Sequence, residues 1–372
     1  MDFKSLLNTT KDKLNDKDIR EWGRHTKFTS LTSQIVFTLR DSIDPEMCTI
    51  AWAKMYEIHS MFHGLLLPPD KPIINTVHLC EAPGAFICAT NHYIKLNYKR
   101  KKWNWFGLSL NPYYEENDLG AMIDDDRFIF ETQDNWSFGA DNSGNIMRRG
   151  NIVSTWERAK EMCGHENGVD LVTADGSVDC QHDPNSQELM TSHLHYCEVV
   201  CGLGMLALKG SMVVKMFTVL EHPTVSIIYF LSLLFDSVEV VKPCSSKAGN
   251  SETYVVCVGF KGISKDLLEV LLSKVDGADP FQTTSFIHKD KIPPAFMSEF
   301  VEVAKYFTNL QRDIIEENLR TFRNENREWR DKISASKNWI ASQWTEKMNA
   351  GRISVDEKIV GNSTLSGSFR NI

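Results

Sequence analysis

The chain lacks the excess of positive charge that attracts nucleic acids. It also has few of the residues that are abundant in unfolded proteins. Its 372 residues carry 41 Lys and Arg against 49 Asp and Glu, a formal net charge of −8. This acidity excludes a protein that binds nucleic acid by general basic charge. Gly and Pro number only 21 and 12, while hydrophobic residues make up 42%. A disordered or fibrous chain is therefore excluded, and the sequence is that of a globular protein.

Two further absences concern metal sites and membranes. The nine cysteines form no Cys-x-x-Cys pair of the kind that structural zinc sites and redox motifs use, so we expect reduced, mostly buried thiols. Residues 1–17 mix acids and bases without the apolar stretch of a signal peptide. The longest apolar run, residues 225–235, is about half of the roughly 20 residues that cross a bilayer. We expect no membrane span and a reducing compartment, the nucleus and cytoplasm.

From about residue 73 short β-branched or aromatic runs alternate with longer helix-like segments, which is typical of a parallel sheet covered by helices. The expected strands are residues 74–80, 104–110, 127–131, 169–175, 211–217, 238–242 and 253–260. The connection between the last two is too short for a helical crossover, so these strands should pair antiparallel. The pattern predicts an α/β fold with a seven-stranded, mostly parallel sheet flanked by helices.

Helical patterns fill the rest of the chain. Helices are expected over residues 187–208 and 225–235, between strands of the sheet. We divide the chain into an N-terminal helical segment of the catalytic domain (1–70), a core (71–285), a helical extension (286–350) and a tail rich in Ser, Gly and Asn (351–372) that should be disordered.

Residues 78–86 (HLCEAPGAF) place an acid, a Pro-Gly turn and small residues where the first strand gives way to a helix. Ligands of open α/β sheets bind at the carboxyl ends of the strands, and glycine lets a ligand approach the backbone. No Gly-x-x-x-x-Gly-Lys or Gly-x-Gly-x-x-Gly motif is present, so an uncharged or zwitterionic adenosine ligand suits this turn better than a nucleoside triphosphate or dinucleotide. A tight turn without a ligand is the alternative for Pro83 and Gly84, but Glu81 favours cofactor binding.

Four charged residues are expected to meet at the edge of the sheet. Lys54 comes from a helix before the sheet, Asp175 ends the fourth strand, Lys215 lies near the end of the fifth and Glu252 opens the last. A lysine inside an apolar strand is costly to bury without partners, and carboxylates on neighbouring strands would supply them. A structural ion-pair cluster without chemistry is the alternative.

Several motifs spread over residues 20–260 are specific in combination. They are AWAK from residue 51, HLCEAPGAFI from 78, LNPYYEEND from 110, WSFGADNSGNI from 136, LVTADGSVDCQ from 171, HYCEVV from 195, VVKMFTVLEH from 213 and SKAGNSETYVVC from 246. In these motifs the chain resembles the FtsJ-type RNA 2'-O-methyltransferases, and most closely the cap-specific mRNA 2'-O-methyltransferase 2 family.

The resemblance implies a Rossmann-like class I methyltransferase that uses S-adenosyl-L-methionine. It implies a Lys-Asp-Lys-Glu tetrad, formed here by Lys54, Asp175, Lys215 and Glu252. It also places the cofactor over the turn that contains Glu81, Pro83, Gly84, Ala85 and Phe86, with Asp175 between cofactor and substrate.

The resemblance implies further cofactor contacts after the second and third strands. Methyltransferases often hold the ribose with an acid after the second strand, where this chain has Ser109 followed by Asn111. Asp134, expected in the loop after the third strand, matches a position that contacts the adenine amino group in related enzymes. A solvated loop acid is the alternative there.

The chemistry of methyl transfer to a ribose hydroxyl agrees with the tetrad. The reaction is an in-line displacement, so the enzyme must align oxygen, methyl carbon and sulfur and help the hydroxyl lose its proton. Lys215 is expected to act as general base or to orient the hydroxyl, with Asp175 and Glu252 positioning it and Lys54 completing the network. Lys54 would lower the pKa of Lys215 and the carboxylates would raise it, so the sign of the net shift stays open.

An acidic protein can bind RNA only through local positive patches. Lys242 and Lys247 flank the Ser- and Gly-rich loop that leads to Glu252, and are the best candidates for phosphate or cap contacts. The basic residues 95–102 are another patch or a solvated helix end. The face with His193, Cys197 and Cys201, near Cys180, His182 and His195, could hold zinc, but buried Cys packing is favoured.

The resulting hypothesis is an enzyme that methylates the ribose 2'-hydroxyl of the second transcribed nucleotide of 5'-capped mRNA, converting cap 1 to cap 2. The alternatives are another RNA 2'-O-methyltransferase, acting on the first cap nucleotide or on rRNA, and an inactive cap- or RNA-binding module. The family resemblance also implies a second, methyltransferase-like half, which this chain does not contain. The tryptophans of the helical extension are candidates for its docking site.

Overall fold

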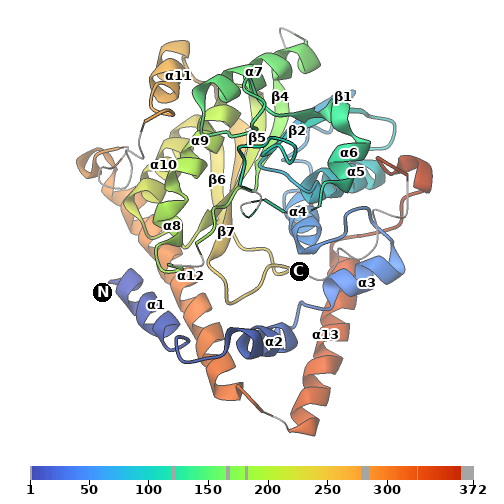
Figure 1. Ribbon diagram of the computed structural model, residues 1–372, viewed down its shortest axis with the longest axis vertical. Coiled ribbons are helices and arrows are strands. Elements are labelled where there is room, and N and C mark those ends of the chain that lie inside the picture. The colour runs from blue at the N-terminus through green and yellow to red at the C-terminus, as the bar shows by residue number, and fades with distance from the viewer. Residues whose placement is uncertain are drawn as a thin grey trace.

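A computed structural model describes residues 2–118, 120, 122–123, 125–164, 168–180, 183–277, 285, 287–324 and 326–361. A central sheet lies between two layers of helices, with further helices below it in the view of Figure 1. The strands are β1 (Ile73–Leu79), β2 (Lys102–Leu108), β3 (Trp136–Ser137), β4 (Val169–Ala174), β5 (Leu206–Phe217), β6 (Phe235–Val241) and β7 (Glu252–Phe260).

The helices of the core follow the strands along the chain. They are α5 (Ala85–Asn97), α6 (Arg127–Glu131), the 3-10 helix η2 (Gln133–Asn135), α7 (Arg149–Cys163), α8 (Gln187–Met190), α9 (Ser192–Leu203), α10 (His222–Leu234) and α11 (Lys265–Leu272). Three of these lie where the sequence predicts two helices: α8 and α9 within 187–208, and α10 over most of 225–235. The first ends earlier than expected, because β5 already begins at Leu206.

The sheet has seven strands in the order β3-β2-β1-β4-β5-β7-β6. β7 pairs antiparallel with both β5 and β6, while the pairs among β1 to β5 are parallel. The seven-stranded, mostly parallel sheet with an antiparallel final pair is therefore confirmed. Because β7 pairs antiparallel with β5, its first residue, Glu252, lies beside the last residue of β5, Phe217.

The prediction of the third strand was wrong. Residues 127–131 form helix α6, and the third strand is the two-residue β3. Phe128 and Ile129 are adjacent and both buried, and a Cβ on Gly84 would lie 2.3 Å from the Phe128 ring. Periodicity could not separate the two structures, because a short apolar run fits a strand and a buried helical turn equally well.

Two apolar cores cover the two faces of the sheet. One core joins the sheet to α7, α9, α10 and α11. The other joins it to α4 (Ile50–Met61), α5 and α3 (Ile35–Ser42), and includes Trp344 from the C-terminal extension. The catalytic candidate Lys54 is thus carried by a helix that is packed directly on the sheet.

The remaining helices lie below the sheet in Figure 1. They are α1 (Phe3–Asp12), α2 (Ile19–Thr29), α12 (Pro294–Thr321) and α13 (Arg327–Lys347), and the short 3-10 helices η3 (Lys289–Lys291) and η4 (Val355–Glu357) complete the chain. The N-terminal helix α1 packs along α12, and α13 packs on α3. Among the described residues, no helix combines the length and apolar character needed to cross a membrane.

The segment that follows α13 corrects a second expectation. Disorder was predicted from residue 351, but residues 351–361 lie against α5 and the α3–α4 connection. The Ile359 and Val360 N–H groups donate to the Glu46 carboxylate at 2.7 and 2.9 Å, and Lys358 pairs with Asp44 at 2.8 Å. The small-residue composition misled the prediction, because these contacts are made by charged residues within and far from the segment. The rest of the predicted tail, 362–372, lies outside the described residues.

Candidate active site

The carboxyl ends of the central strands meet at one edge of the sheet. Leu79 of β1 pairs with Leu108 of β2 and with Ala174 of β4. The residues that follow these strands therefore gather at the same edge, and the Asp175 N–H donates to the Leu79 carbonyl at 3.2 Å. This is the edge at which open α/β sheets bind their ligands.

The Pro-Gly turn after β1 is held by its own acid. Glu81 is buried, and its Oε1 accepts the Phe86 and Ile87 N–H groups at 2.8 and 3.1 Å. These are free N–H groups of the first turn of α5, so Glu81 caps that helix. Burial raises the pKa of Glu81 well above its ordinary value, against the opposing effect of these hydrogen bonds.

Gly84 at this turn adopts a backbone conformation that other residues rarely tolerate. It is the N-cap of α5 with φ +113°, and Phe128 occupies the space that a side chain would need. The glycine is thus required by the turn itself and by the packing of α6 over it. Ser109 follows β2, and its Oγ accepts the Ala82 N–H of the same turn at 3.2 Å.

Lys54 and Glu252 form a buried ion pair across this edge. The Lys54 Nζ on α4 lies 2.6 Å from Glu252 Oε1 at the start of β7, and each side chain is 11% exposed. Ser246 Oγ donates to the same carboxylate at 2.9 Å. Burial would raise the pKa of Glu252, but the charges of Lys54 and Lys215 outweigh it and lower the pKa.

Lys215 and Asp175 form the second pair. The Lys215 Nζ donates to the backbone carbonyl of Asp175 at 2.6 Å and lies 3.3 Å from its Oδ1. The Tyr254 hydroxyl donates to the same Oδ1 at 3.1 Å, and Tyr254 faces Lys215 directly in the β5–β7 register. The Asp175 carboxylate is thus fixed by two neighbours from two strands.

The four predicted residues therefore lie together, as two adjacent ion pairs. Phe217 pairs with Glu252 in the register, which brings the last strand's carboxylate to the end of β5. Burial alone would lower the pKa of Lys215, but the charges of Asp175 and Glu252 outweigh it, so the pKa is raised. Lys215 is an ammonium at neutral pH in this arrangement. The part of the four residues in catalysis stays a prediction.

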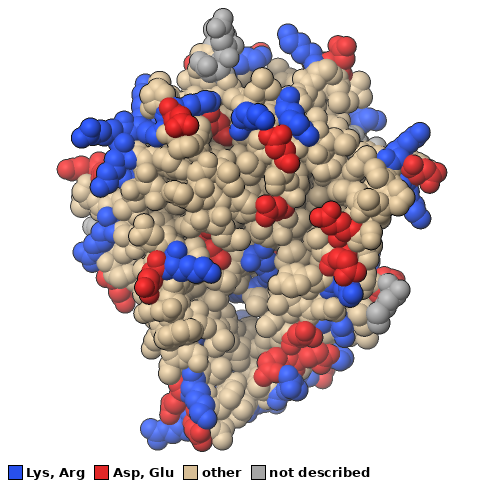
Figure 2. Space-filling view, turned by 180° about the vertical axis from the view of Figure 1, so that it is seen from behind, with Lys and Arg blue, Asp and Glu red and all other residues tan. Residues whose placement is uncertain are grey.

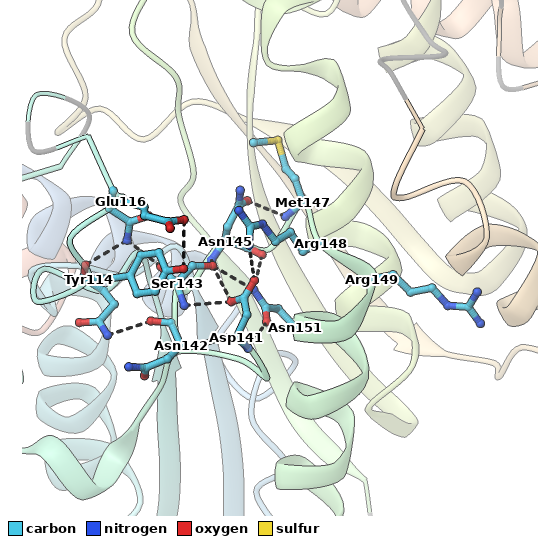
Figure 3. Close-up of polar contacts among 12 residues, drawn as sticks. Tyr114, Glu116, Asp141, Asn142, Ser143, Asn145, Met147, Arg148, Arg149 and Asn151 are labelled. Carbon is cyan, nitrogen blue, oxygen red and sulfur yellow. Dashed lines mark hydrogen bonds and ion pairs between the residues drawn. The ribbon is translucent and has the colours of Figure 1, made fainter.

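The loops after β2 and β3 are tied together beside this site. The Asn111 side chain donates to the Asn142 carbonyl at 2.8 Å, and its backbone N–H donates to the Ser143 carbonyl at 3.0 Å. In the second loop Asp141 lies at the centre of a polar cluster with Ser143, Arg148 and Asn151 (Figure 3). Burial would raise the pKa of Asp141, yet the hydrogen bonds that it accepts lower it. Asn111 thus holds a loop in place, and its predicted cofactor contact stays a prediction.

The structure corrects the position of Asp134. Because the third strand begins at Trp136, Asp134 precedes that strand and does not follow it; it lies in η2. Its carbonyl accepts from Arg158, and together they border a hollow on the outer edge of β2 with Trp103 and Asn104. This places Asp134 beside β2, before the carboxyl end of that strand, and its predicted adenine contact stays a prediction.

Of the two lysines predicted to bind RNA, one is engaged in its own loop. The Lys242 Nζ donates to the Asn250 carbonyl, the Asn250 Oδ1 and the Glu252 carbonyl at 3.0, 2.6 and 2.6 Å. Burial lowers the pKa of Lys242 to about 8, against the opposing charge of Glu252. Lys242 therefore closes the loop from 242 to 252, whereas Lys247 is exposed on that loop. Their contacts with RNA stay predictions.

Sequence reasoning missed three residues that support the site. Tyr254 and Ser246 contact the tetrad directly, and Glu57 lies one helical turn after Lys54. Glu57 accepts the Cys244 and Ser245 N–H groups at 2.7 and 3.0 Å and the Trp344 indole N–H at 2.9 Å. The i, i+2 spacing of Glu252 and Tyr254 on one strand could have identified Tyr254, since alternate residues share a face. Nothing local signals Glu57 or Ser246.

The zinc alternative has no geometric support within the part of the chain that the structure describes. There, no group of three or more His, Cys, Asp or Glu side chains is arranged to hold a metal ion. On α9, His193 Nε2 lies 3.7 Å from Cys197 Sγ, and Cys197 and Cys201 are fully buried in the core. His182, named with them from the sequence, lies outside the described residues.

The fold and this edge define a Rossmann-like methyltransferase architecture: a seven-stranded sheet with β7 inserted antiparallel, a glycine turn after β1 and charged residues at the carboxyl ends. Residues 49–260 match the FtsJ-like methyltransferase family. The chain belongs to that family.

Curated relatives extend the similarity beyond the methyltransferase core. The chain is 41% identical over 354 residues to the cap-specific mRNA (nucleoside-2'-O-)-methyltransferase 2 of Danio rerio, which covers 93% of this chain and 46% of that protein. The proteins of the same name from Mus musculus and Drosophila melanogaster are each 38% identical, over 99% and 88% of this chain and 48% and 47% of their own lengths. The chain thus spans about half the length of these relatives.

Proposed function

We propose that the chain uses S-adenosyl-L-methionine to methylate the ribose 2'-hydroxyl of the second transcribed nucleotide of 5'-capped mRNA. The observation that carries this proposal is the pair of buried ion pairs, Lys54 with Glu252 and Lys215 with Asp175, at the carboxyl edge beside the glycine turn. The choice of capped mRNA rests on the relatives that bear this name.

The residues beside the turn suit the proposed cofactor. The methyl donor is a sulfonium cation, and the charge of Asp175 lies close enough to Glu81 to contribute to its raised pKa. The Asp175 side chain is 20% exposed, so part of this negative charge is accessible from the edge. The cofactor would supply an activated methyl group, and Glu81, the turn and Asp175 are the residues that would hold it.

The two ion pairs assign separate tasks to the tetrad in this proposal. Lys215, held by the carbonyl and carboxylate of Asp175, presents an ammonium that orients the attacking hydroxyl oxygen. A bound cation nearby would lower the pKa of Lys215 by Coulomb repulsion, which favours its acting as general base only when the site is loaded. Lys54 keeps Glu252 ionised, and Glu252 in turn fixes the charge beside Lys215.

In this proposal the acidic chain binds RNA through local positive charge. Acidic and basic side chains are interspersed over the face shown in Figure 2, which has no single basic surface. The exposed Lys247 lies on the loop that leads to Glu252. We infer recognition of a capped 5' end with little affinity for RNA at large. The nine cysteines, all among the described residues, form no disulfide, and all but Cys244 are at least partly buried, which supports a reducing compartment, the nucleus and cytoplasm.

The test compares methyl-donor binding with methyl transfer. Calorimetry should show S-adenosyl-L-methionine binding to the chain, and labelled methyl should pass to capped transcripts but not to the same transcripts without a cap. Binding of capped RNA without any donor affinity would instead identify an inactive binding module. Equal labelling of capped and uncapped RNA would identify a different RNA 2'-O-methyltransferase.

A further inference from the structure

A buried carboxylate that belongs to none of the predicted sites lies beneath the tetrad. Glu198 on α9 is fully buried, and its Oε1 accepts the Gly176 N–H at 2.9 Å. Gly176 directly follows Asp175, the residue proposed to lie between cofactor and substrate. A buried carboxylate is costly to maintain unless its hydrogen bonds are needed where it lies.

The hydrogen bond from Gly176 belongs to the same peptide group that holds Lys215. The carbonyl of that peptide is the Asp175 oxygen that accepts the Lys215 ammonium at 2.6 Å, and its N–H is the one that Glu198 accepts. One peptide group therefore joins an ammonium at one end to a carboxylate at the other. Charged groups at both ends polarise the peptide and strengthen both hydrogen bonds.

Close contacts on both sides hold this peptide in its orientation. A Cβ on Gly176 would lie 2.3 Å from Glu198 Oε1, so the turn rests directly on the carboxylate. On the other side, the Asp175 N–H is held by the Leu79 carbonyl of β1. Without the Glu198 carboxylate, the peptide could rotate and withdraw its carbonyl from Lys215.

The charge of Glu198 also acts on the tetrad. The ionisable groups that face it are Cys80 at the end of β1, Asp175 after β4, Lys215 on β5 and Cys201 on its own helix. Burial raises the pKa of Glu198 to about 7, while Lys215 and the hydrogen bonds from Cys80 and Gly176 oppose burial. In the other direction, the Glu198 charge is one of those that raise the pKa of Lys215.

We propose that Glu198 is a positioning residue for methyl transfer, which orients the peptide between Asp175 and Gly176 and thereby fixes the Lys215 ammonium. Only the expected effect of Glu198 on turnover rests on the proposed function. The geometric claim, that Glu198 controls the environment of Lys215, holds for the protein without substrate.

Two substitutions separate the hydrogen bond from the charge. Glu198→Gln keeps an acceptor of the same size but removes the charge, and we expect kcat to fall about 10-fold. Glu198→Ala removes both, and we expect a fall of about 100-fold, since a misplaced reacting group costs roughly that much. The KM for the methyl donor should change little in both, because Glu198 is placed behind the peptide and not at the ligand.

The titration of Lys215 tests the positioning role, because a merely structural role of Glu198 would leave this titration unchanged. In nuclear magnetic resonance of the protein with labelled lysine, the Lys215 Cε signal should titrate at lower pH in Glu198→Gln than in the wild type. The wild-type signal should also show an inflection near pH 7 from Glu198 itself, which Glu198→Gln lacks. The wild-type inflection does not depend on the folding of any variant.

Glu46→Gln is the matched control, because Glu46 is also buried and accepts backbone N–H groups, from Ile359 and Val360. It should lower the melting temperature without altering the Lys215 titration. An unchanged Lys215 titration in Glu198→Gln, with no inflection in the wild type, would overturn the proposal. If the wild type transfers no methyl group, the proposed function fails, while the Lys215 titration still decides the role of Glu198.

Discussion

At the scale of single residues, the decisive quantity is the charge of Lys215. From the sequence the sign of the shift in its pKa stayed open, because Lys54 and the carboxylates act in opposite directions. In the structure the nearest partners of Lys215 are the Asp175 carbonyl and carboxylate, whereas Lys54 is paired with Glu252. The pKa of Lys215 is consequently raised, although burial alone would lower it. We therefore propose that Lys215 orients the hydroxyl as an ammonium until a bound cation changes its environment.

Removing this ammonium should abolish turnover without emptying the cofactor site. For Lys215→Ala we expect kcat to fall by at least about 100-fold, the usual contribution of a positioned proton-transfer group. Methyl-donor affinity measured by calorimetry should stay within a few-fold. Lys209→Ala is the control, because Lys209 is on the same strand with a side chain 75% exposed. Near-normal turnover of Lys215→Ala with donor bound would show that the role assigned to Lys215 is wrong.

The ion pair between Lys54 and Glu252 should matter for stability as well as for catalysis. Lys54→Met leaves Glu252 buried without its main partner, and loss of one member of a buried pair costs about 3–5 kcal/mol. Lys332→Met breaks an exposed pair with Glu328 and should cost under about 1 kcal/mol. Chemical denaturation of both variants measures the difference. Equal losses would mean that the buried pair contributes no more than a surface pair.

The same pair predicts a pH dependence of definite sign. The folded-state pKa of Glu252 is lowered, so its ionised form stabilises the fold above the ordinary carboxyl range. This stabilisation should be complete at neutral pH and lost as pH falls through the lowered folded pKa. The difference in unfolding free energy between wild type and Glu252→Gln should therefore be constant near neutrality and shrink on acidification.

At the scale of elements, the sequence predicts what depends on local pattern and fails where contacts are distant. The strand around 211–217 and the strand opening at Glu252 were predictable from their β-branched runs. Helix α6 was not, because its identity depends on Phe128 packing against Gly84, 44 positions earlier in the chain. The tetrad could be assembled because strand order brings the ends of parallel strands together.

The C-terminal extension also makes a distant contact that could not be predicted from the sequence. It was predicted as a helical tail with tryptophans available for docking. Trp339 is 66% exposed, as that expectation requires, but Trp344 is buried and donates to Glu57 on the helix that carries Lys54. This contact spans 287 positions, so no local pattern could indicate it. The extension therefore supports the site through α4.

Glu57 should accordingly control the loop that leads to Glu252. Glu57→Ala leaves the Cys244 and Ser245 N–H groups and the Trp344 indole without their acceptor, so we expect faster amide exchange over residues 243–251. Hydrogen exchange with mass spectrometry measures this. The control is Glu46→Gln, whose effect should be confined to residues 351–361. Unchanged exchange over 243–251 in Glu57→Ala would contradict the assigned role.

At the scale of the whole molecule, the acidity of the chain limits how RNA can be bound. Its net charge of −8 argues against tracking along RNA, and the mixed charges in Figure 2 agree. A recognised 5' end brought to a small charged site is compatible with such a surface. The fold and the grouping of the tetrad could be predicted from the sequence. The nucleotide that enters the site could not, because the tetrad would be the same for any ribose hydroxyl.

The most direct test of the central claim is to map the nucleotide that receives the methyl group. Capped transcripts that already carry the first 2'-O-methyl group are incubated with the chain and a labelled methyl donor, then digested with nuclease. The account predicts label on the ribose of the second transcribed nucleotide, and none when Lys215→Ala replaces the wild type. Label at internal positions, or no transfer at all, would contradict it.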